Sequence, residues 1–189
     1  MEGAQVLVKT TCSSRYAAEH ENTTHFSAGD RLRAIACGAI ASRFIVDSNR
    51  VITDDQTMTN IVGEALDTMS SELILLDGYP RFPQATELFL DMAHRRNYIL
   101  SGLVSFVASE TICLERVLSR GRRLGDMSSQ VGVERAAVLR YRQDVELVAQ
   151  LQDTLRETVP QVATLNANSE LSVVQNQFDV CIDNMKNTQ

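Results

Sequence analysis

The chain has 189 residues, of which 44% are hydrophobic and 22% charged, and its formal net charge is -6. This composition is typical of one globular domain and argues against a disordered or fibrous protein. The negative charge disfavours nucleic acids and anionic membranes as partners, because their phosphates are repelled by it. No stretch is apolar for long enough to span a bilayer, and the N-terminus lacks a signal-peptide pattern.

The cysteines give no sign of a metal site or a disulfide framework. Cys12, Cys37, Cys113 and Cys181 are scattered and show no paired spacing. We therefore expect an intracellular protein in a reducing compartment, with the cytoplasm as the simplest location.

In chain order, short apolar runs alternate with helical patterns. Strands are predicted at residues 5–8, 24–27, 73–76, 99–108 and 162–165. Helices are predicted at residues 15–21, 31–46 with a break at Gly38, 54–69, 83–96, 110–119, 133–158 and 171–185. Asp30 and Thr53 are the predicted N-caps of the helices that follow them. The alternation predicts an α/β fold of three layers, α/β/α, with a central five-stranded parallel sheet in one domain of residues 1–189.

Residues 73–81 (LILLDGYPR) are the stretch with the clearest chemistry. A branched apolar run that ends in an acid and a glycine is typical of a buried strand, and parallel sheets bind ligands beyond the carboxyl ends of their strands. There, Asp77 is placed to hold a metal ion through water. Gly78 lets the backbone turn, and Arg81 can reach a phosphate with a planar set of donors.

Several segments together resemble adenylate kinases and other nucleoside monophosphate kinases of the short-lid type. These are residues 26–33 (FSAGDRLR), 50–54 (RVITD), 75–81 (LLDGYPR) and 83–85 (PQA), and their order and spacing also match. The resemblance implies a P-loop nucleoside-kinase-like fold. It also implies a small helical region for the nucleoside monophosphate (NMP) at about 27–70 and a lid at about 121–132.

The resemblance also implies a monophosphate site. Its residues are Ser27, Ala28, Gly29, Arg33, Val51, Ile52, Gly78, Arg81 and Gln84. Arg33 and Arg81 would hold the phosphate, Val51 and Ile52 would present backbone carbonyls to the base, and Gln84 would read an adenine edge.

The roles given to the two arginines and to Asp77 each have a simpler alternative. Arg33 and Arg81 could instead form surface ion pairs with acids such as Asp30 or Asp77, which are common and weak. Asp77 would organise water around Mg²⁺ by the resemblance, or hydrogen-bond the neighbouring loop instead.

The triphosphate side departs from the family. An active kinase needs a G-x-x-x-x-G-K-S/T loop after its first strand, and the segment taken as its counterpart, residues 9–16, has no glycine. In this alignment Arg15 replaces the lysine and Tyr16 replaces the small hydroxyl residue. A non-glycine residue in the left-handed conformation costs about 1–2 kcal/mol. We therefore expect an ordinary strand-to-helix turn with Ser13 and Ser14 as caps, followed by a shortened helix.

The lid has also lost charged residues that the family uses. Aligned without a gap, Arg120 is retained, whereas Asp126 and Ala137 stand where further arginines are expected. Losing one arginine that stabilises the transferring phosphoryl group lowers the rate about 10³-fold or more. Arg15 and Arg120 are the residual candidates for catalysis.

Two functions follow from this pattern. The first is a pseudoenzyme with a partly retained AMP pocket, acting with protein partners as a structural or regulatory subunit of a larger assembly; family analogy suggests axonemal and mitochondrial complexes. The alternative is a divergent active kinase that moves the γ-phosphate of ATP to AMP or a related monophosphate and uses Mg²⁺.

Overall fold

The structure, a computed structural model, describes residues 4–44, 46, 54–123 and 130–187. It divides into two compact units, and each is described by itself. One unit comprises Met1–Cys12 and Ser101–Gln189, and the other comprises Ser13–Leu100.

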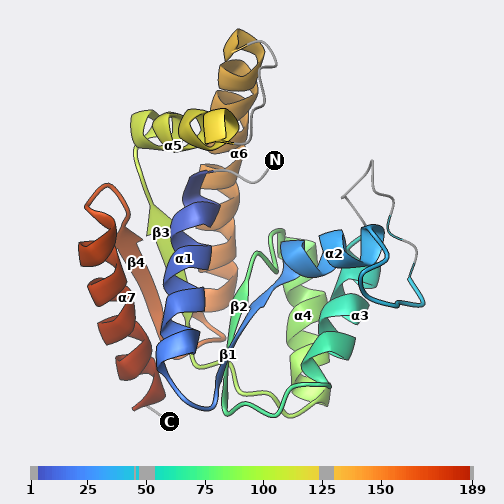
Figure 1. Ribbon diagram of the computed structural model, residues 1–189. Helices are drawn as coiled ribbons and strands as arrows, with labels where there is room; N and C mark the ends of the chain where they lie inside the picture. The colour runs from blue at the N-terminus through green and yellow to red at the C-terminus, as the bar shows by residue number, and fades with distance from the viewer. Residues whose placement is uncertain (1–3, 45, 47–53, 124–129, 188–189) are drawn as a thin grey trace. The chain divides into compact units, whose positions relative to one another are not determined.

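The chain begins with a helix, α1, which spans Ala4–Glu19 (Figure 1). The predicted strand at residues 5–8 is therefore wrong, and the predicted helix at 15–21 is the end of a longer one. Cys12 and Tyr16 are both 0% exposed and lie four residues apart, which places them on one helical face. A run of only three apolar residues, Val6 to Val8, has no period of its own, so the helical pattern that follows it decides its conformation.

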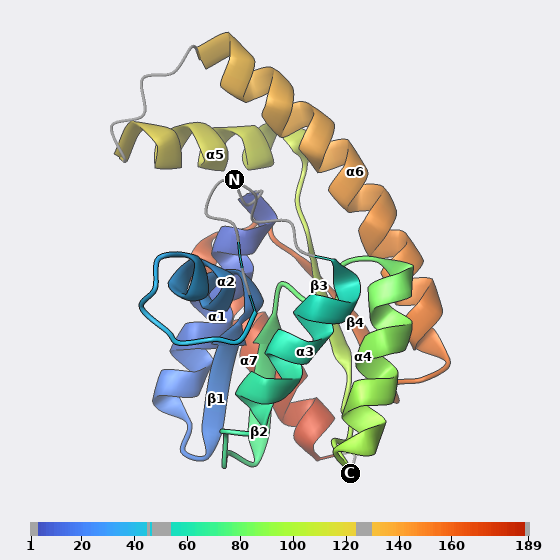
Figure 2. The ribbon, with the colours of Figure 1, turned by 90° about the vertical axis from the view of Figure 1, so that its right-hand side faces the viewer.

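In the unit Ser13–Leu100, two parallel strands carry three helices. Strand β1, Thr23–Ser27, pairs with β2, Leu73–Asp77, in a register that sets Thr23 beside Leu73 and Ser27 beside Asp77. Helix α2, Ala28–Ala36, continues directly from β1. Helices α3, Asp55–Leu66, and α4, Pro83–Arg95, pack side by side (Figure 2). The predicted strand at 73–76 and the helix start at Pro83 are confirmed.

The helix ends in this unit differ from the prediction in detail. Ser27, not Asp30, is the N-cap of α2, and its hydroxyl accepts a hydrogen bond from the Asp30 amide at 3.2 Å. Asp54 caps α3 by accepting from the Thr57 amide at 2.8 Å, while Thr53 lies outside the described residues. The predicted helical continuation after residue 38 is wrong for the described residues, because Gly38, at φ +74°, ends that helical region.

The core of this unit lies between the strands and the apolar faces of the three helices. Its buried members include Phe26, Leu32, Met58, Ile61, Val62, Ala65, Leu66, Tyr79, Ala85, Phe89 and Met92. The rings of Tyr79 and Phe89 meet edge to face, with centroids 6.0 Å apart. The loop after β2 is thereby packed into the same core as α4.

A two-pronged ion pair joins the C-terminal ends of α3 and α4. Arg96 donates from Nε to Asp67 Oδ1 at 2.8 Å and from Nη2 to Oδ2 at 3.0 Å. The hydrogen bonds from Arg96 hold the pKa of the Asp67 carboxyl below its ordinary value. The pair therefore stabilises the folded state only while Asp67 is ionised.

Asp67→Asn is expected to lower the free energy of unfolding at pH 7 by up to about 1 kcal/mol, because the pair is partly exposed. The lowered pKa means that this stability is complete above the ordinary carboxyl pKa of about 3.9 and is lost as the pH falls through the folded value. Urea unfolding of the wild type and Asp67→Asn at pH 7 and below pH 4 measures this. The difference in their free energies of unfolding should be smaller at the lower pH. Asp91→Asn, which breaks the exposed pair with Arg95 within α4, is the control. A difference that stays constant with pH contradicts the prediction.

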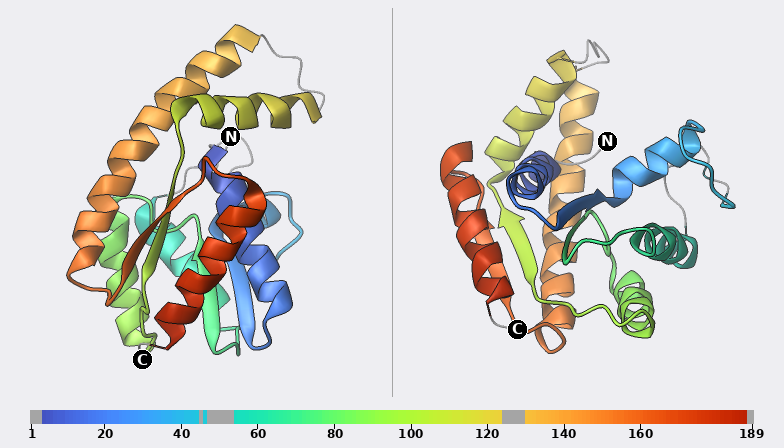
Figure 3. Two further views of the ribbon diagram at one scale, coloured as in Figure 1. Left: turned by 90° about the vertical axis from the view of Figure 1, so that its left-hand side faces the viewer. Right: turned by 60° about the horizontal axis from the view of Figure 1, so that its bottom comes forward.

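In the other unit, two parallel strands lie between helices (Figure 3). Strand β3, Leu103–Val107, pairs with β4, Val162–Asn166; α7, Leu171–Lys186, packs on β4, and α6, Gln130–Arg156, contacts both strands. Helix α5, Glu110–Arg123, packs against α6. The predicted strand at 99–108 is shorter than expected, since β3 spans only Leu103–Val107. Residues 124–129 of the predicted lid at 121–132 lie outside the described residues.

Two close approaches hold this unit together. The rings of Phe106 and Phe178 stack with centroids 5.8 Å apart. A Cβ on Gly102 would lie only 2.6 Å from the Met185 sulfur and 2.9 Å from the Gln161 carbonyl, so the backbone passes where only glycine fits.

The α/β class is confirmed, but a five-stranded sheet is not. The described residues form two parallel sheets of two strands each, β1-β2 and β3-β4. Four of the five predicted strands are present, and the fifth is the segment that lies in α1. None of the described helices has the length and apolar character that crossing a membrane requires.

Candidate functional site

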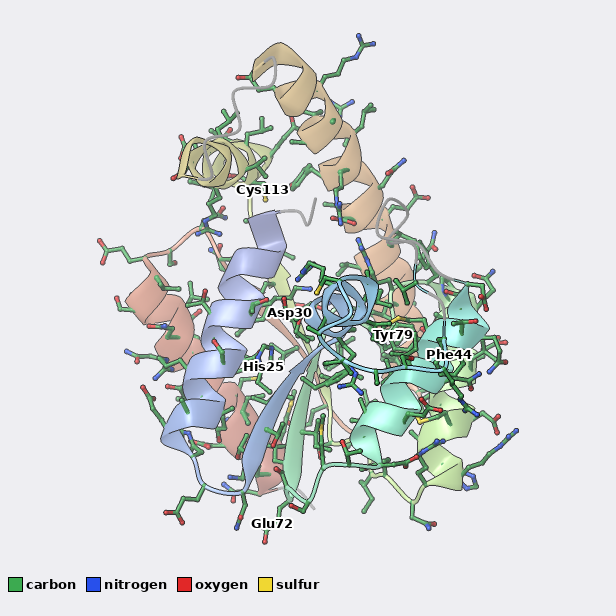
Figure 4. All side chains as sticks on the ribbon, turned by 45° about the vertical axis from the view of Figure 1, so that its right-hand side comes forward. His25, Asp30, Phe44, Glu72, Tyr79 and Cys113 are labelled. Atoms are coloured by element: carbon green, nitrogen blue, oxygen red, sulfur yellow. The ribbon has the colours of Figure 1, made fainter. Side chains whose placement is uncertain are left out.

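The candidate site lies at the carboxyl ends of β1 and β2. Ser27 and Asp77 end these strands as direct neighbours, and from there the chain enters α2 on one side and the turn at Gly78 on the other. Figure 4 shows Asp30 and Tyr79 at this end of the sheet and Glu72 at the opposite end. Ligands of parallel sheets bind at this edge.

The start of α2 is suited to an anion. The backbone amides of Ala28 and Gly29 have no acceptor inside the helix, because the first turn of any α-helix leaves its amides unused. Ser27 accepts from the Asp30 amide and so fixes the first turn. A phosphate placed here would meet backbone donors and the positive end of the helix dipole.

Arg33 lies in the last turn of α2 and pairs with Asp30 at 2.5 Å. The side chains are 47% and 63% exposed, and the hydrogen bond from Arg33 is the main reason that the pKa of Asp30 is lowered. The ion pair that was the alternative for Arg33 is thus present in this structure. An exposed pair is worth at most about 1 kcal/mol, so a phosphate dianion can compete for the arginine.

The turn after β2 presents the second predicted arginine. Gly78 has φ +83°, a conformation that residues with a side chain rarely adopt, and a cis peptide bond follows between Tyr79 and Pro80. Arg81 and Gln84 are both exposed and stand just before and just inside the start of α4. Val51 and Ile52, predicted to contact the base, lie outside the described residues.

Asp77 has a neighbour that the sequence analysis did not predict. His25 Nε2 lies 3.6 Å from Asp77 Oδ2, and the two side chains are only 12% and 5% exposed. His25 lies two residues before Ser27 on β1, and side chains at that spacing share one face of the sheet. This period-two pairing across parallel strands could have identified the contact, once the strand register was known.

The segment assigned to the phosphate loop is helical throughout. Within α1 the backbone amides donate to carbonyls four residues earlier, so they cannot be directed together at a phosphate. Arg15 pairs with Glu19 at 2.5 Å, and Tyr16 is fully buried and stacks on His20. Ser13 lies inside the helix as well. The predicted capped turn and shortened helix are therefore wrong.

The sequence analysis also missed a second register for this motif. Lys9-Thr10 is a K-S/T pair followed by nine helical residues that end at Glu19, and a helix after the pair is what the motif requires. In this register the first glycine is Gly3, but Val8 occupies the position of the second one. The spacing between the K-S/T pair and β1 was the signal that could have revealed it.

Polar groups also converge at the carboxyl ends of β3 and β4, in the other unit. Arg116 donates from Nη2 to the Ala167 carbonyl at 2.7 Å, and its Nη1 is buried without a hydrogen-bond partner among the described residues. The Ser109 amide donates to Asn168 Oδ1 at 2.7 Å, and the Tyr141 hydroxyl donates to the Ala108 carbonyl at 3.0 Å. Arg116 was not predicted as a site residue.

The lid residues are only partly described. Arg120 lies in α5, and its side chain is outside the described part of the structure, as is residue Asp126. Two arginines of α6 form ion pairs, Arg140 with Asp144 at 3.7 Å and Arg142 with Glu110 of α5 at 3.6 Å.

Known proteins resemble this chain over most of the region just described. A family profile described as an AAA domain matches residues 9–131. The adenylate kinase of Campylobacter concisus is 35% identical over 130 residues, 66% of this chain and 68% of that protein. The adenylate kinase of Campylobacter jejuni is 36% identical over 131 residues, 66% of this chain and 67% of that protein. The adenylate kinase of Corynebacterium glutamicum is 30% identical over 102 residues, 52% of this chain and 56% of that protein.

The family predicted from the motifs at residues 26–33 and 75–81 is thus supported by similarity over two thirds of the chain. The chain belongs to the adenylate kinase family.

Proposed function

We propose that this chain is an adenylate-kinase-like pseudoenzyme that binds AMP but forms no ATP site of the family type. In this proposal it acts as a structural or regulatory subunit in a complex with other proteins. Ser27, Ala28, Gly29, Arg33, Gly78, Arg81 and Gln84 form the described part of the AMP pocket, and Val51 and Ile52 complete it.

The observation that carries the proposal is the helical conformation of Ala4–Glu19. A phosphate loop works because successive amides turn toward one anion, and this requires backbone conformations that are not helical. In either register of the motif, the residues at issue lie mostly in α1, whose amides bond to carbonyls of the same helix. Such a segment offers little to the β- and γ-phosphates of ATP.

The monophosphate half has the opposite character. It combines the amides at the start of α2 with two arginines on exposed positions, so a phosphate can enter without displacing a buried group. Two guanidinium groups suit a dianion in charge and in geometry. This difference between the two halves supports AMP as a ligand over ATP.

Magnesium use fits this chain only in the presence of nucleotide phosphates. Mg²⁺ is usually held by one or two carboxylates together with phosphates and water. No group of three or more acidic, histidine or cysteine side chains suited to a metal occurs among the described residues. Asp77 would contribute through water, and bound Mg²⁺ would supply positive charge beside the phosphates.

Calorimetric titration of the purified chain with AMP and with ATP tests the ligand preference. We expect saturable binding of AMP and much weaker binding of ATP, because only the monophosphate half presents donors to a phosphate. Inorganic phosphate is the control for a site that recognises the anion alone. Equal, tight binding of both nucleotides contradicts the proposal, and purification from the native source as a free monomer contradicts the subunit role.

A second candidate function, an active kinase, is favoured by Lys9-Thr10. This pair closes the phosphate-loop motif, and the family profile begins to match at residue 9. For this function the first turns of α1 must unwind into a loop around the phosphates, with Val8 in the place of a glycine. ATP-dependent protection of Lys9 from chemical acylation would support this second candidate.

A further inference from the structure

The Tyr79 hydroxyl connects three segments of the unit Ser13–Leu100. Tyr79 is 8% exposed and lies in the turn between Gly78 and Arg81. Its hydroxyl lies 2.5 Å from the hydroxyl of Thr59 in α3 and 3.5 Å from the carbonyl of Ala85 in the first turn of α4. Figure 4 shows Tyr79 at the end of the sheet where the candidate site lies. One side chain thus touches α3, α4 and the arginine-bearing turn.

The direction of these hydrogen bonds follows from the protons available. Thr59 donates its hydroxyl proton to the Asp55 carbonyl one turn earlier, at 2.7 Å, and so has only acceptor capacity left. Tyr79 then donates its one hydroxyl proton to Thr59, which is nearer than the Asp55 carbonyl at 3.4 Å. Burial raises the pKa of the Tyr79 hydroxyl above its ordinary value, which keeps it a donor at neutral pH.

We propose that Tyr79 is a positioning residue for monophosphate binding, acting with Thr59 to hold Arg81 and Gln84 in place. This inference rests on the proposed function. Arg81 follows Tyr79 by two residues, and Gln84 adjoins Ala85, the α4 residue that Tyr79 approaches. The hydrogen bond to Thr59 fixes the turn against α3, and the ring of Tyr79 packs on Phe89 of α4, so the two exposed ligands start from a fixed backbone. Binding then loses less entropy in ordering them.

Tyr79→Phe removes only one oxygen and keeps the ring against Phe89, so the core packing is preserved. We expect AMP to bind about two- to tenfold more weakly to this variant, as the loss of one hydrogen bond predicts. Thr59→Val should weaken binding to a similar degree, and Thr59→Ser, which keeps the hydroxyl, should restore it. The double variant should be no weaker than either single one, because both remove the same bond.

Tyr98→Phe is the matched control. The Tyr98 hydroxyl donates to the Leu66 carbonyl at 2.9 Å, at the opposite end of α3. This variant also loses one tyrosine hydrogen bond and is expected to lose similar stability in urea without a change in AMP affinity. An equal loss of AMP affinity in Tyr79→Phe and Tyr98→Phe would show that general destabilisation, not positioning, is responsible.

Hydrogen exchange without ligand separates this inference from the proposed function. The amides of residues 81–86 should exchange faster in Tyr79→Phe than in the wild type, and should be unchanged in Tyr98→Phe. If the wild type does not bind AMP, the proposed function fails, and this exchange measurement alone decides whether Tyr79 orders the turn. Unchanged amide exchange in Tyr79→Phe overturns the inference. If the wild type binds AMP, an AMP affinity of Tyr79→Phe equal to that of the wild type also overturns it.

Discussion

Purified protein mixed with ATP, AMP and Mg²⁺ is expected to form no ADP above background. The segment that should surround the triphosphate lies in α1, Ala4–Glu19, and its amides are bonded within the helix. In the gapless alignment of the sequence analysis, Asp126 and Ala137 stand where further arginines are expected. Each arginine that stabilises phosphoryl transfer contributes about 10³-fold or more to the rate. The loss of these two arginines together with the phosphate-binding loop should reduce turnover to an undetectable level.

A coupled assay of ADP formation measures this directly. The adenylate kinase of Campylobacter jejuni, prepared in the same way, is the positive control for the assay. Robust turnover that disappears in Arg81→Ala would contradict the pseudoenzyme proposal, because contaminating kinases would not respond to that substitution. It would favour the active kinase in which Lys9-Thr10 reaches the phosphates.

Arg81→Ala is expected to weaken AMP binding about tenfold to a hundredfold. A hydrogen bond to a charged group contributes about 1.5–3 kcal/mol, and 1.4 kcal/mol corresponds to a factor of ten in affinity. Arg81→Lys keeps the charge but loses the planar pair of donors, so its affinity for AMP should fall between those of the wild type and Arg81→Ala. Calorimetric titration of AMP into each variant measures the effect.

Arg95→Ala is the control for this series. Arg95 also carries an exposed guanidinium on the same unit, in the last turn of α4, where it pairs with Asp91. Its removal lowers the positive charge by the same amount and should leave AMP affinity unchanged. If Arg95→Ala and Arg81→Ala weaken binding equally, AMP is attracted by the overall field and not by a defined pocket.

The pattern of the sequence predicted those parts of the molecule whose structure depends on local chemistry. The run at Leu73–Asp77 is apolar, short and followed by glycine, and it is a strand for those reasons. The helix that starts at Pro83 follows from the fixed φ of proline at the first helical position. The family was also predicted correctly, because each of its motifs, at residues 26–33 and 75–81, is an unbroken run of residues and the spacing between them is kept.

Features that depend on contacts between distant residues were not predictable in this way. The side chains of residues 5–8 are compatible with either a strand or a helix. These residues lie in α1, whose face with Cys12 and Tyr16 is buried. The neighbours His25 and Asp77, and likewise Thr59 and Tyr79, are brought together only by strand pairing and helix packing. Residue type and spacing thus predicted the family and the ligand chemistry that is proposed for the chain. Tertiary packing decided which backbone amides remain available to use it, because an amide bonded inside a helix cannot also bind a phosphate.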